Sequence, residues 1–236
     1  MSQLHNKRRM LCLLVPLSLS YCICGCVCGC VREGFRGDAE GWHRAPIEWV
    51  AYELSIMLGM DYVPPVALRG EVELDGRKYD EGAFMHYVPD AKPVNSLSKE
   101  QLEEAGVNME ELLSDTRILD VLLQNSDRHS GHFLWGKHWI KEEPSLALID
   151  HAAGFRKEAY VSMEHDNAFQ TGPVKKISAK TYMRLRFLDT ALLAEKFATT
   201  LSRTELRLLA ERRDSILSYF DNLVSQQGFS KTVIEI

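Results

Sequence analysis

The placement of its cysteines constrains this chain more than any other feature of the sequence. All six cysteines lie at or before Cys30, and residues 31–236 contain none. The body of the chain therefore has neither a disulfide framework nor a thiolate metal site. It must fold around a hydrophobic core, and about 200 residues suffice for one large domain or two small ones.

The first thirty residues differ sharply from the rest. Residues 10–31 carry no charge, follow a basic triplet at residues 7–9 and precede Arg32. Such a pattern is typical of a signal peptide or signal anchor, and 22 residues are long enough to span a bilayer. The alternation of Cys and Gly over residues 22–30 also allows an acylated cysteine cluster or a metal-binding tract. The whole segment is otherwise an incidental leader with no folded role, or the result of an incorrect gene-model start. A genuine leader predicts a membrane or secretory-pathway localisation; without one we expect a cytoplasmic protein.

Composition places the body among ordinary globular proteins. Hydrophobic residues make up 45% and charged residues 26%, which excludes a wholly disordered chain, collagen and a multi-span membrane protein. The net charge of -5 offers no general attraction to phosphate backbones, so we expect no nucleic-acid partner. The basic residues between Lys175 and Arg186 fit either a solvated face or a site that receives an anionic substrate.

Hydrophobic periodicity and capping signals predict helices mixed with short strands. Apolar residues recur at helical spacing over 47–58, and Gly59 ends the run. The pair Asp75-Gly76 indicates a hairpin turn, and a capping box begins at Ser98. The other expected elements are helices over 109–124, 178–198 and 202–226, and short strands over 132–135 and 145–149.

Two carboxylates stand where this pattern brings chain elements together. Asp127 lies in the polar loop after the helix over 109–124, and Asp150 ends the second of the two short strands. Phosphoryl transfer needs such a pair, because one carboxylate orients the attacking hydroxyl and accepts its proton while another holds the magnesium that bridges the nucleotide phosphates. Asp127 suits the first role and Asp150 the second.

The residues around these carboxylates resemble a known family. Asp127-Arg128-His129 is similar to the catalytic loop of the phosphatidylinositol 3-/4-kinase-like branch of the protein-kinase fold, and the segment 148–155 is similar to its metal-binding segment. Glu48 resembles the glutamate of the regulatory helix, which is commonly followed by Leu-Gly and Val-Pro as it is here. Residues 82–89 resemble the strand and hinge that hold adenine. The resemblance covers roughly residues 44–226.

This resemblance implies an α+β, protein-kinase-like bilobal fold that uses ATP and Mg²⁺. It divides the chain into a leader over 1–31, a truncated N-lobe with the hinge over 32–90, and a mainly helical C-lobe over 91–236. It assigns catalysis to Asp127, Arg128 and His129, ATP binding to Glu48, Met85, His86, Tyr87 and Val88, and the metal to Asp150 and His132. Each residue also has a structural interpretation, such as a loop cap for Asp127 or packing in the core for Met85.

Two departures from the family pattern affect the expected activity. His132 stands where the related kinases usually have asparagine, so it is a divergent metal ligand, or another group serves, or metal affinity is impaired, since magnesium prefers oxygen. The glycine-rich loop and the strand lysine must precede Glu48, yet the only earlier lysine is Lys7. We therefore expect a fragment or a degenerate kinase that binds ATP weakly.

Three functions are consistent with these observations. The first is a kinase that phosphorylates a hydroxyl on a lipid, a protein or a sugar, with impaired activity. The second is a pseudokinase that acts as a binding module, and the third is a scaffold tethered to a membrane by its leader. The branch also resembles secretory-pathway casein kinases, although the absence of cysteine after Cys30 argues against a disulfide-rich secretory kinase.

Overall fold

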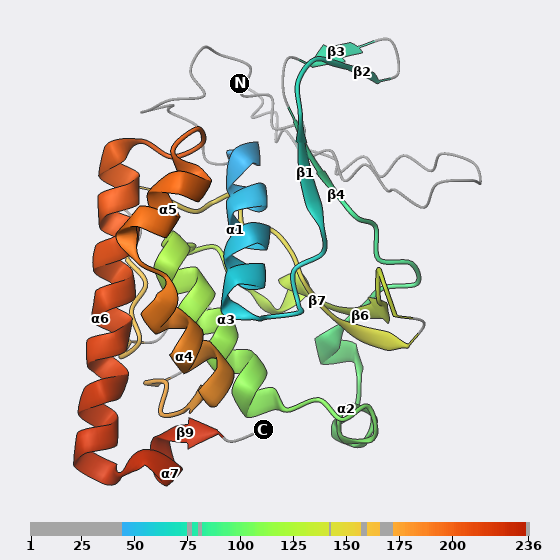
Figure 1. The fold of residues 1–236 in the computed structure, drawn as a ribbon. Helices are drawn as coiled ribbons and strands as arrows, with labels where there is room; N and C mark the ends of the chain where they lie inside the picture. The colour runs from blue at the N-terminus through green and yellow to red at the C-terminus, as the bar shows by residue number, and fades with distance from the viewer. Residues whose placement is uncertain are drawn as a thin grey trace, which may run out of the picture.

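The computed structural model describes residues 44–74, 77–79, 82–141, 143–156, 160–165 and 172–234. The expected leader over 1–31 lies outside this part of the chain, and the expected boundary between residues 90 and 91 stays a prediction. The described elements form a strand-rich side and a helix-rich side, with helix α1 (Ala45–Leu58) between them (Figure 1). No helix of the described residues is long and apolar enough to cross a membrane.

Helix α1 forms where the periodic pattern predicts it. Pro46 lies in the first turn, where its missing N–H costs nothing, and Gly59 closes the helix in the left-handed conformation at φ 74°. Five of its apolar residues are fully buried: Ile47, Val50, Ala51, Leu54 and Leu58. The helix contacts both sides of the molecule, because it packs on β1, β4, α3 and α4. The helix is therefore a fixed reference point for any side chain that it carries.

The strand-rich side begins with two antiparallel pairs. Strand β1 (Val66–Arg69) pairs with β4 (Gly82–Met85), and β2 (Val72–Leu74) pairs with β3 (Arg77–Tyr79). Leu74 lies opposite Arg77, and this antiparallel pairing confirms the expected hairpin. A small apolar cluster of β1 and β4 residues packs against α1.

A second, three-stranded antiparallel sheet has the order β5-β6-β7. Its strands are β5 (Lys92–Pro93), β6 (Phe133–Lys137) and β7 (Pro144–Leu148), and the last two agree closely with the expected strands. The short helices η1 (Val94–Ser96), α2 (Lys99–Glu104) and η2 (Ser130–His132) flank this sheet. Ser98 caps α2 through the expected capping box with Gln101.

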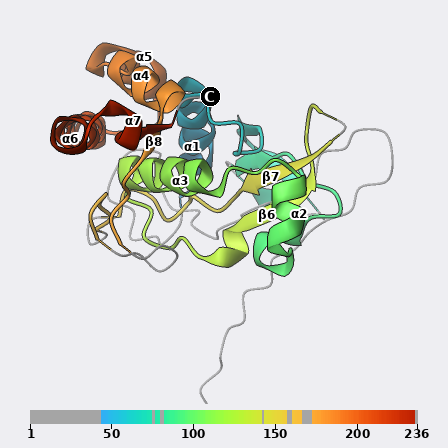
Figure 2. The same ribbon diagram turned by 90° about the horizontal axis from the view of Figure 1, so that it is seen from below.

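The helix-rich side contains most of the core, and Figure 2 shows its helices gathered away from β6, β7 and α2. Its helices are α3 (Met109–Leu123), α4 (Ala179–Phe187), α5 (Thr190–Phe197), α6 (Arg203–Gln227) and α7 (Phe229–Thr232). The chain end returns as β9 (Val233–Ile234), which pairs in parallel with β8 (Ile177–Ser178) just before α4. Sequence periodicity did not predict this two-residue pairing.

The expected single helix over 178–198 is wrong, because the segment forms two helices. Helix α4 ends at Phe187, and the Asp189 side chain accepts a hydrogen bond of 2.8 Å from the backbone N–H of Leu192, which starts α5. An aspartate at this position competes with the helix backbone and favours a cap. The apolar pattern continues through the break, so periodicity alone does not reveal it.

A buried carboxyl joins α3 to the start of α4. Asp115 is fully buried; its Oδ1 accepts a hydrogen bond of 2.9 Å from the Thr181 hydroxyl, while its Oδ2 has no hydrogen-bond partner in the described part of the chain. Burial raises the pKa of Asp115 from 3.8 to about 7. The folded protein therefore keeps a proton that the unfolded chain releases near pH 4.

This carboxyl makes stability fall as pH rises from about 4 to 7, because the folded state binds more protons than the unfolded state in that window. We predict that Asp115→Asn removes this dependence. The unfolding free energy of the variant minus that of the wild-type chain should rise between pH 5 and pH 8. The rise should be at least about 1.4 kcal/mol, the value of one pKa unit. Urea unfolding at both pH values measures it, with the exposed Asp214→Asn as control. An advantage that does not change with pH contradicts the assignment.

Candidate active site

The loop after α3 presents Asp127 to solvent on a fixed backbone. Helix α3 ends at Gln124 in the left-handed conformation (φ 54°), and this turn sends the chain into the loop. The Asn125 side chain accepts a hydrogen bond of 3.3 Å from the backbone N–H of Asp127. Asp127 itself is exposed, so its carboxylate is available to a ligand.

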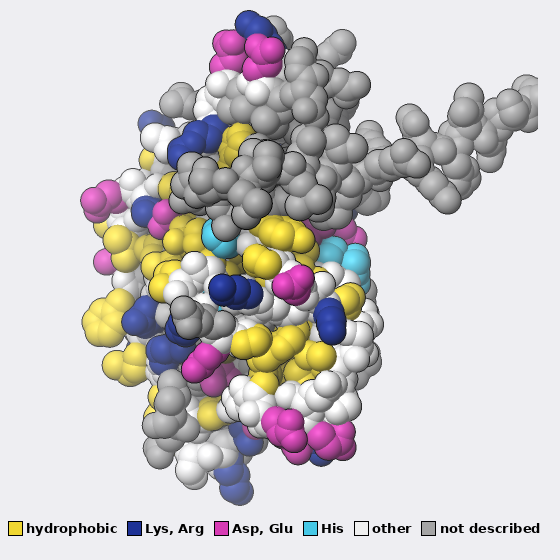
Figure 3. All heavy atoms as spheres, turned by 90° about the vertical axis from the view of Figure 1, so that its right-hand side faces the viewer, with side chains coloured by type: hydrophobic (Ala, Val, Ile, Leu, Met, Phe, Trp, Pro, Cys, Tyr) yellow, Lys and Arg dark blue, Asp and Glu magenta, His cyan; other side chains and the backbone are white. Residues whose placement is uncertain are grey.

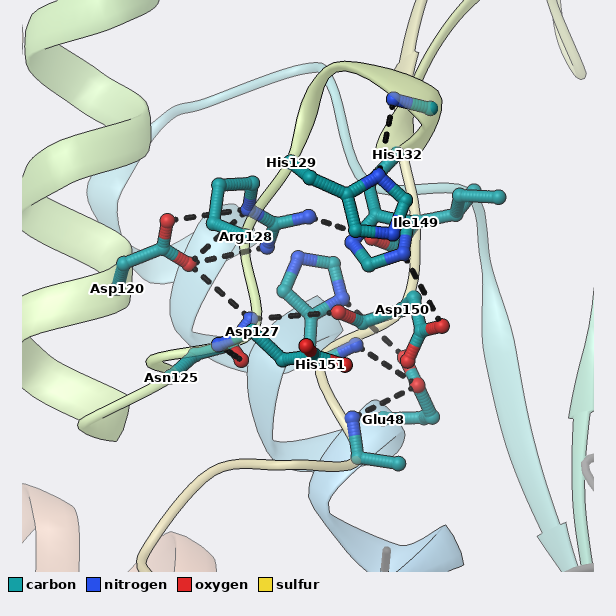
Figure 4. A network of polar contacts seen from close by, with 12 residues as sticks. Glu48, Asp120, Asn125, Asp127, Arg128, His129, His132, Ile149, Asp150 and His151 are labelled. Atoms are coloured by element: carbon teal, nitrogen blue, oxygen red, sulfur yellow. Dashed lines mark hydrogen bonds and ion pairs between the residues drawn. The ribbon is translucent and has the colours of Figure 1, made fainter. Parts of the chain in front are cut away.

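The neighbouring residue, Arg128, anchors this loop to the rest of the molecule. Arg128 and Asp120 are both almost fully buried, and two guanidinium nitrogens donate to the Asp120 carboxylate, with Nε at 3.0 Å from Oδ2 and Nη2 at 2.9 Å from Oδ1. The third nitrogen, Nη1, donates to the carbonyl oxygen of Ile149 at 2.6 Å. Arg128 therefore ties the loop to α3 and to the residue before Asp150 (Figure 4).

A second tie reaches Asp150 itself. The Asn125 side chain lies 3.3 Å from the Asp120 carboxylate and donates to the carbonyl oxygen of Asp150 at 3.2 Å. Asp120, Asn125 and Arg128 thus form a buried polar core that fixes the backbones of both Asp127 and Asp150. Sequence reasoning missed Asp120 and Asn125, although an aspartate on the apolar face of an otherwise hydrophobic helix end was a usable signal.

His132 lies beside the carboxylate of Asp150. Its Nε2 is 3.3 Å from Asp150 Oδ2, and its Nδ1 has no hydrogen-bond partner among the described residues. Burial, with the nearby Arg128 charge, lowers the pKa of His132 to about 3, so the imidazole is neutral. His129 packs its ring against His132 at 3.6 Å between centroids, and its Nδ1 accepts a hydrogen bond from the backbone N–H of Gly131.

Glu48 reaches the same region from α1. It accepts hydrogen bonds from the backbone N–H of His151 at 2.8 Å and of Ala152 at 2.9 Å, and its Oε2 lies 3.2 Å from His151 Nδ1. Burial alone raises the pKa of Glu48, but the contacts with His151 and the two backbone N–H groups outweigh it, so the pKa lies below its ordinary value. The carboxylate is therefore ionised at neutral pH.

The residues expected to hold adenine begin with the last residue of β4, and they lie in different environments. Met85 packs with Val66 and Ala83 in the small cluster that also contacts Ile149, next to Asp150. Val88 is buried against β6, and a Cβ at Gly136 would lie 2.6 Å from it. The structure thus places both as packing residues, Met85 beside Ile149 and Val88 against β6.

The other two expected adenine residues are more accessible. Burial, with a smaller effect of His138, lowers the pKa of His86, and Tyr87 is exposed. Seen from the strand-rich side, hydrophobic side chains surround single basic, acidic and histidine side chains in the middle of the face (Figure 3).

His132 Nε2 and Asp150 Oδ2 contact each other directly, and their separation is also close to that of two ligands on one cation. Two ligands in adjacent octahedral positions, each about 2.1 Å from the ion, lie about 3 Å apart, and the two atoms are 3.3 Å apart here. The described residues contain no group of three or more His, Cys, Asp or Glu side chains arranged to hold a metal ion. The remaining ligands would be phosphate oxygens and water, which is usual for magnesium in nucleotide sites.

Comparison with known proteins identifies solved structures of similar fold. No protein-family model matches the sequence, and no curated protein matches it. Among solved structures, hydra Fam20 with sugar aligns at 16% identity with a TM-score of 0.54, over 83% of this chain and 76% of that one. The Golgi casein kinase aligns at 14% identity with a TM-score of 0.56, and its Mn/ADP-bound form at 13% with 0.57. Each of these two alignments covers 86% of this chain and 66% of the other.

The chain has a protein-kinase-like fold. The expected α+β, bilobal fold class is thereby confirmed. The expected phosphatidylinositol-kinase branch is not supported, because these neighbours are Fam20 and Golgi casein kinase structures. The chain spans about two thirds of the casein kinase structures, and the identities are low enough that the likeness concerns the fold alone.

We predict that Asp120→Ala destabilises the protein by about 3–5 kcal/mol, because it leaves the Arg128 charge buried without its partner. Urea unfolding measures the loss. Glu103→Gln is the matched control: it removes an exposed ion pair with Lys99, and such pairs contribute at most about 1 kcal/mol. Equal effects of the two substitutions contradict the structural role of Asp120.

Proposed function

We propose that this chain is an ATP-dependent phosphotransferase that moves the γ-phosphoryl group to a hydroxyl of a protein or a sugar. The observation that carries the proposal is the buried core of Asp120, Asn125 and Arg128, which fixes the backbones of Asp127 and Asp150 in a protein-kinase-like fold. A buried network of this kind restricts two loops to one arrangement, and catalysis by positioning requires such rigidity.

Asp127 would orient the attacking hydroxyl and accept its proton. The hydroxyl oxygen forms a bond to the γ-phosphorus, the bond from that phosphorus to the bridging oxygen of ADP breaks, and the hydroxyl proton passes to the Asp127 carboxylate. The exposure of Asp127 supports this role, because an acceptor substrate can reach it. Arg128 holds the loop that carries Asp127 through its buried hydrogen bonds, and His129 follows in the same loop.

Asp150 and His132 would hold the divalent cation. A bound cation neutralises phosphate charge while the group is transferred. Magnesium prefers oxygen ligands and manganese accepts an imidazole nitrogen more readily, so we propose that this site uses Mn²⁺ as well as Mg²⁺. The Mn/ADP complex of the Golgi casein kinase supports this proposal.

The adenine of ATP would lie against the segment from Met85 to Val88, with His86 and Tyr87 as its accessible members. The acceptor would be a protein or a sugar rather than a lipid, because the similar structures are a casein kinase and a Fam20 bound to sugar. We propose a secretory-pathway location, which the similarity to the Golgi casein kinase supports.

A second candidate function is a nucleotide-binding module that does not transfer phosphate. One observation favours it: among the described residues, Glu48 forms no ion pair with a lysine or arginine. In protein kinases a strand lysine pairs with the corresponding glutamate and contacts the nucleotide phosphates.

Two substitutions separate these functions. With the full chain, ATP and Mn²⁺ or Mg²⁺, we predict that Asp150→Asn abolishes the metal-dependent thermal shift caused by nucleotide, because it removes a ligand charge. Asp127→Asn should keep that shift but lower phosphate transfer to a casein or sugar acceptor by about 10²- to 10⁴-fold. Asp214→Asn, on the exposed face of α6, is the control for both assays.

A thermal shift without any transfer by the wild-type chain supports the binding module. Transfer that survives Asp127→Asn unchanged contradicts the kinase mechanism.

His132 determines the preferred metal in this proposal. Replacing its nitrogen by an amide oxygen in His132→Asn should favour magnesium over manganese by about tenfold, a difference of about 1.4 kcal/mol. Titration of ADP with each metal, followed by calorimetry, measures the ratio of the two affinities. An unchanged ratio would show that His132 does not ligate the cation.

A further inference from the structure

Within the described part of the chain, the hydrogen bonds of Glu48 all go to the two residues directly after Asp150, which are His151 and Ala152. A carboxylate offers about four acceptor positions. Three of them are used by the backbone N–H groups of His151 and Ala152 and by His151 Nδ1. Glu48 is buried, so water does not compete for these bonds.

We propose that Glu48 and His151 form a latch that sets the position of Asp150. The latch consists of the Glu48 carboxylate, the His151 side chain, and the backbone N–H groups of His151 and Ala152. Glu48 and His151 are then positioning residues of the nucleotide–metal site. The consequence for nucleotide binding rests on the proposed function, while the latch itself belongs to the ligand-free protein.

Asp150 is held from both sides along the chain. On the N-terminal side, Arg128 binds the carbonyl of Ile149 and Asn125 binds the carbonyl of Asp150. On the C-terminal side, Glu48 binds the next two N–H groups. Asp150 has φ 62°, a left-handed conformation that side chains other than glycine adopt at a cost, so its backbone needs such support.

The latch also has a rigid base. Glu48 lies in the first turns of α1, a helix packed on both sides of the molecule. The backbone N–H of Arg44, just before α1, also donates to the carbonyl of Ala152 at 2.9 Å. The start of α1 therefore holds Ala152 through both its N–H and its carbonyl, and a shift of α1 would move the Asp150 loop with it.

The surroundings of His151 favour one tautomer of its ring. The side chain is fully buried, and its Nε2 has no hydrogen-bond partner among the described residues. With the proton on Nδ1, the ring donates to Glu48 and leaves only an unpaired acceptor at Nε2. An unpaired acceptor is tolerated better than an unpaired N–H, so the tautomer with Nδ1–H satisfies this position best.

The test compares Glu48→Gln with Glu48→Ala in the full chain. Glutamine keeps an oxygen for both backbone N–H groups, so it retains the main-chain part of the latch without the charge. Alanine removes the latch. In the ligand-free protein, we expect amide hydrogen exchange at His151 and Ala152 to accelerate at least tenfold in Glu48→Ala and less than threefold in Glu48→Gln.

The same variants are then titrated with ADP and Mn²⁺ by calorimetry. We expect Glu48→Gln to bind within threefold of the wild-type chain and Glu48→Ala to bind at least tenfold more weakly. Glu53→Ala is the matched control, since Glu53 lies on the same helix but pairs with Lys196 at 2.7 Å, away from the site. It should change neither readout.

Two results would overturn the latch. One is a loss of affinity in Glu48→Gln as large as in Glu48→Ala, which indicates a role that depends on the charge, such as a lysine pair. The other is unchanged exchange at His151 and Ala152 in Glu48→Ala. If the wild-type chain binds no ADP with Mn²⁺, the proposed function fails, and the exchange rates still decide the latch.

Should Glu48→Ala fail to fold, His151 supplies the second pair of variants. His151→Ala removes the ring from the latch, and His151→Asn restores a side-chain N–H that can reach Glu48. We expect faster exchange at Ala152 in the alanine variant and recovery in the asparagine variant. Equal exchange in both would overturn the role of His151.

Discussion

The buried ion pair between Arg128 and Asp120 is the interaction on which the site depends. Two charges removed from water are stable only when hydrogen bonds satisfy them. Arg128 meets this requirement with two bonds to Asp120 and one to the carbonyl of Ile149. Because these partners lie on α3 and at the end of β7, satisfying one guanidinium aligns three separate parts of the chain.

Helix α1 supplies the opposing support. Its apolar face is buried between the strand-rich and helix-rich sides, so its position is set by packing rather than by the site. Glu48 transfers that fixed position to the backbone after Asp150. The Asp150 loop is thus held on one side by Arg128, which is paired with Asp120 of α3, and on the other side by the Glu48 carboxylate of α1.

Sequence reasoning predicted the features that depend on neighbours along the chain. The end of α1 at Gly59, the capping box at Ser98 and the order of Asp127 before Asp150 all follow from local patterns. The partners of Arg128 and Glu48 depend on how distant elements pack, so a single sequence did not predict them. The break before α5 was missed for another reason: its signal, the cap at Asp189, lies inside a continuous apolar pattern.

The proposed function depends above all on Asp150 binding a metal–nucleotide complex beside Asp127. The most direct measurement is a crystal structure of the full chain grown with ADP and Mn²⁺, with diffraction data that locate manganese by its anomalous scattering. We expect a manganese peak about 2.2 Å from an Asp150 carboxylate oxygen, with the ADP phosphates on the same ion and Asp127 facing the open side. Manganese and ADP bound elsewhere on the molecule, with Asp150 making no contact to either, would contradict this binding mode.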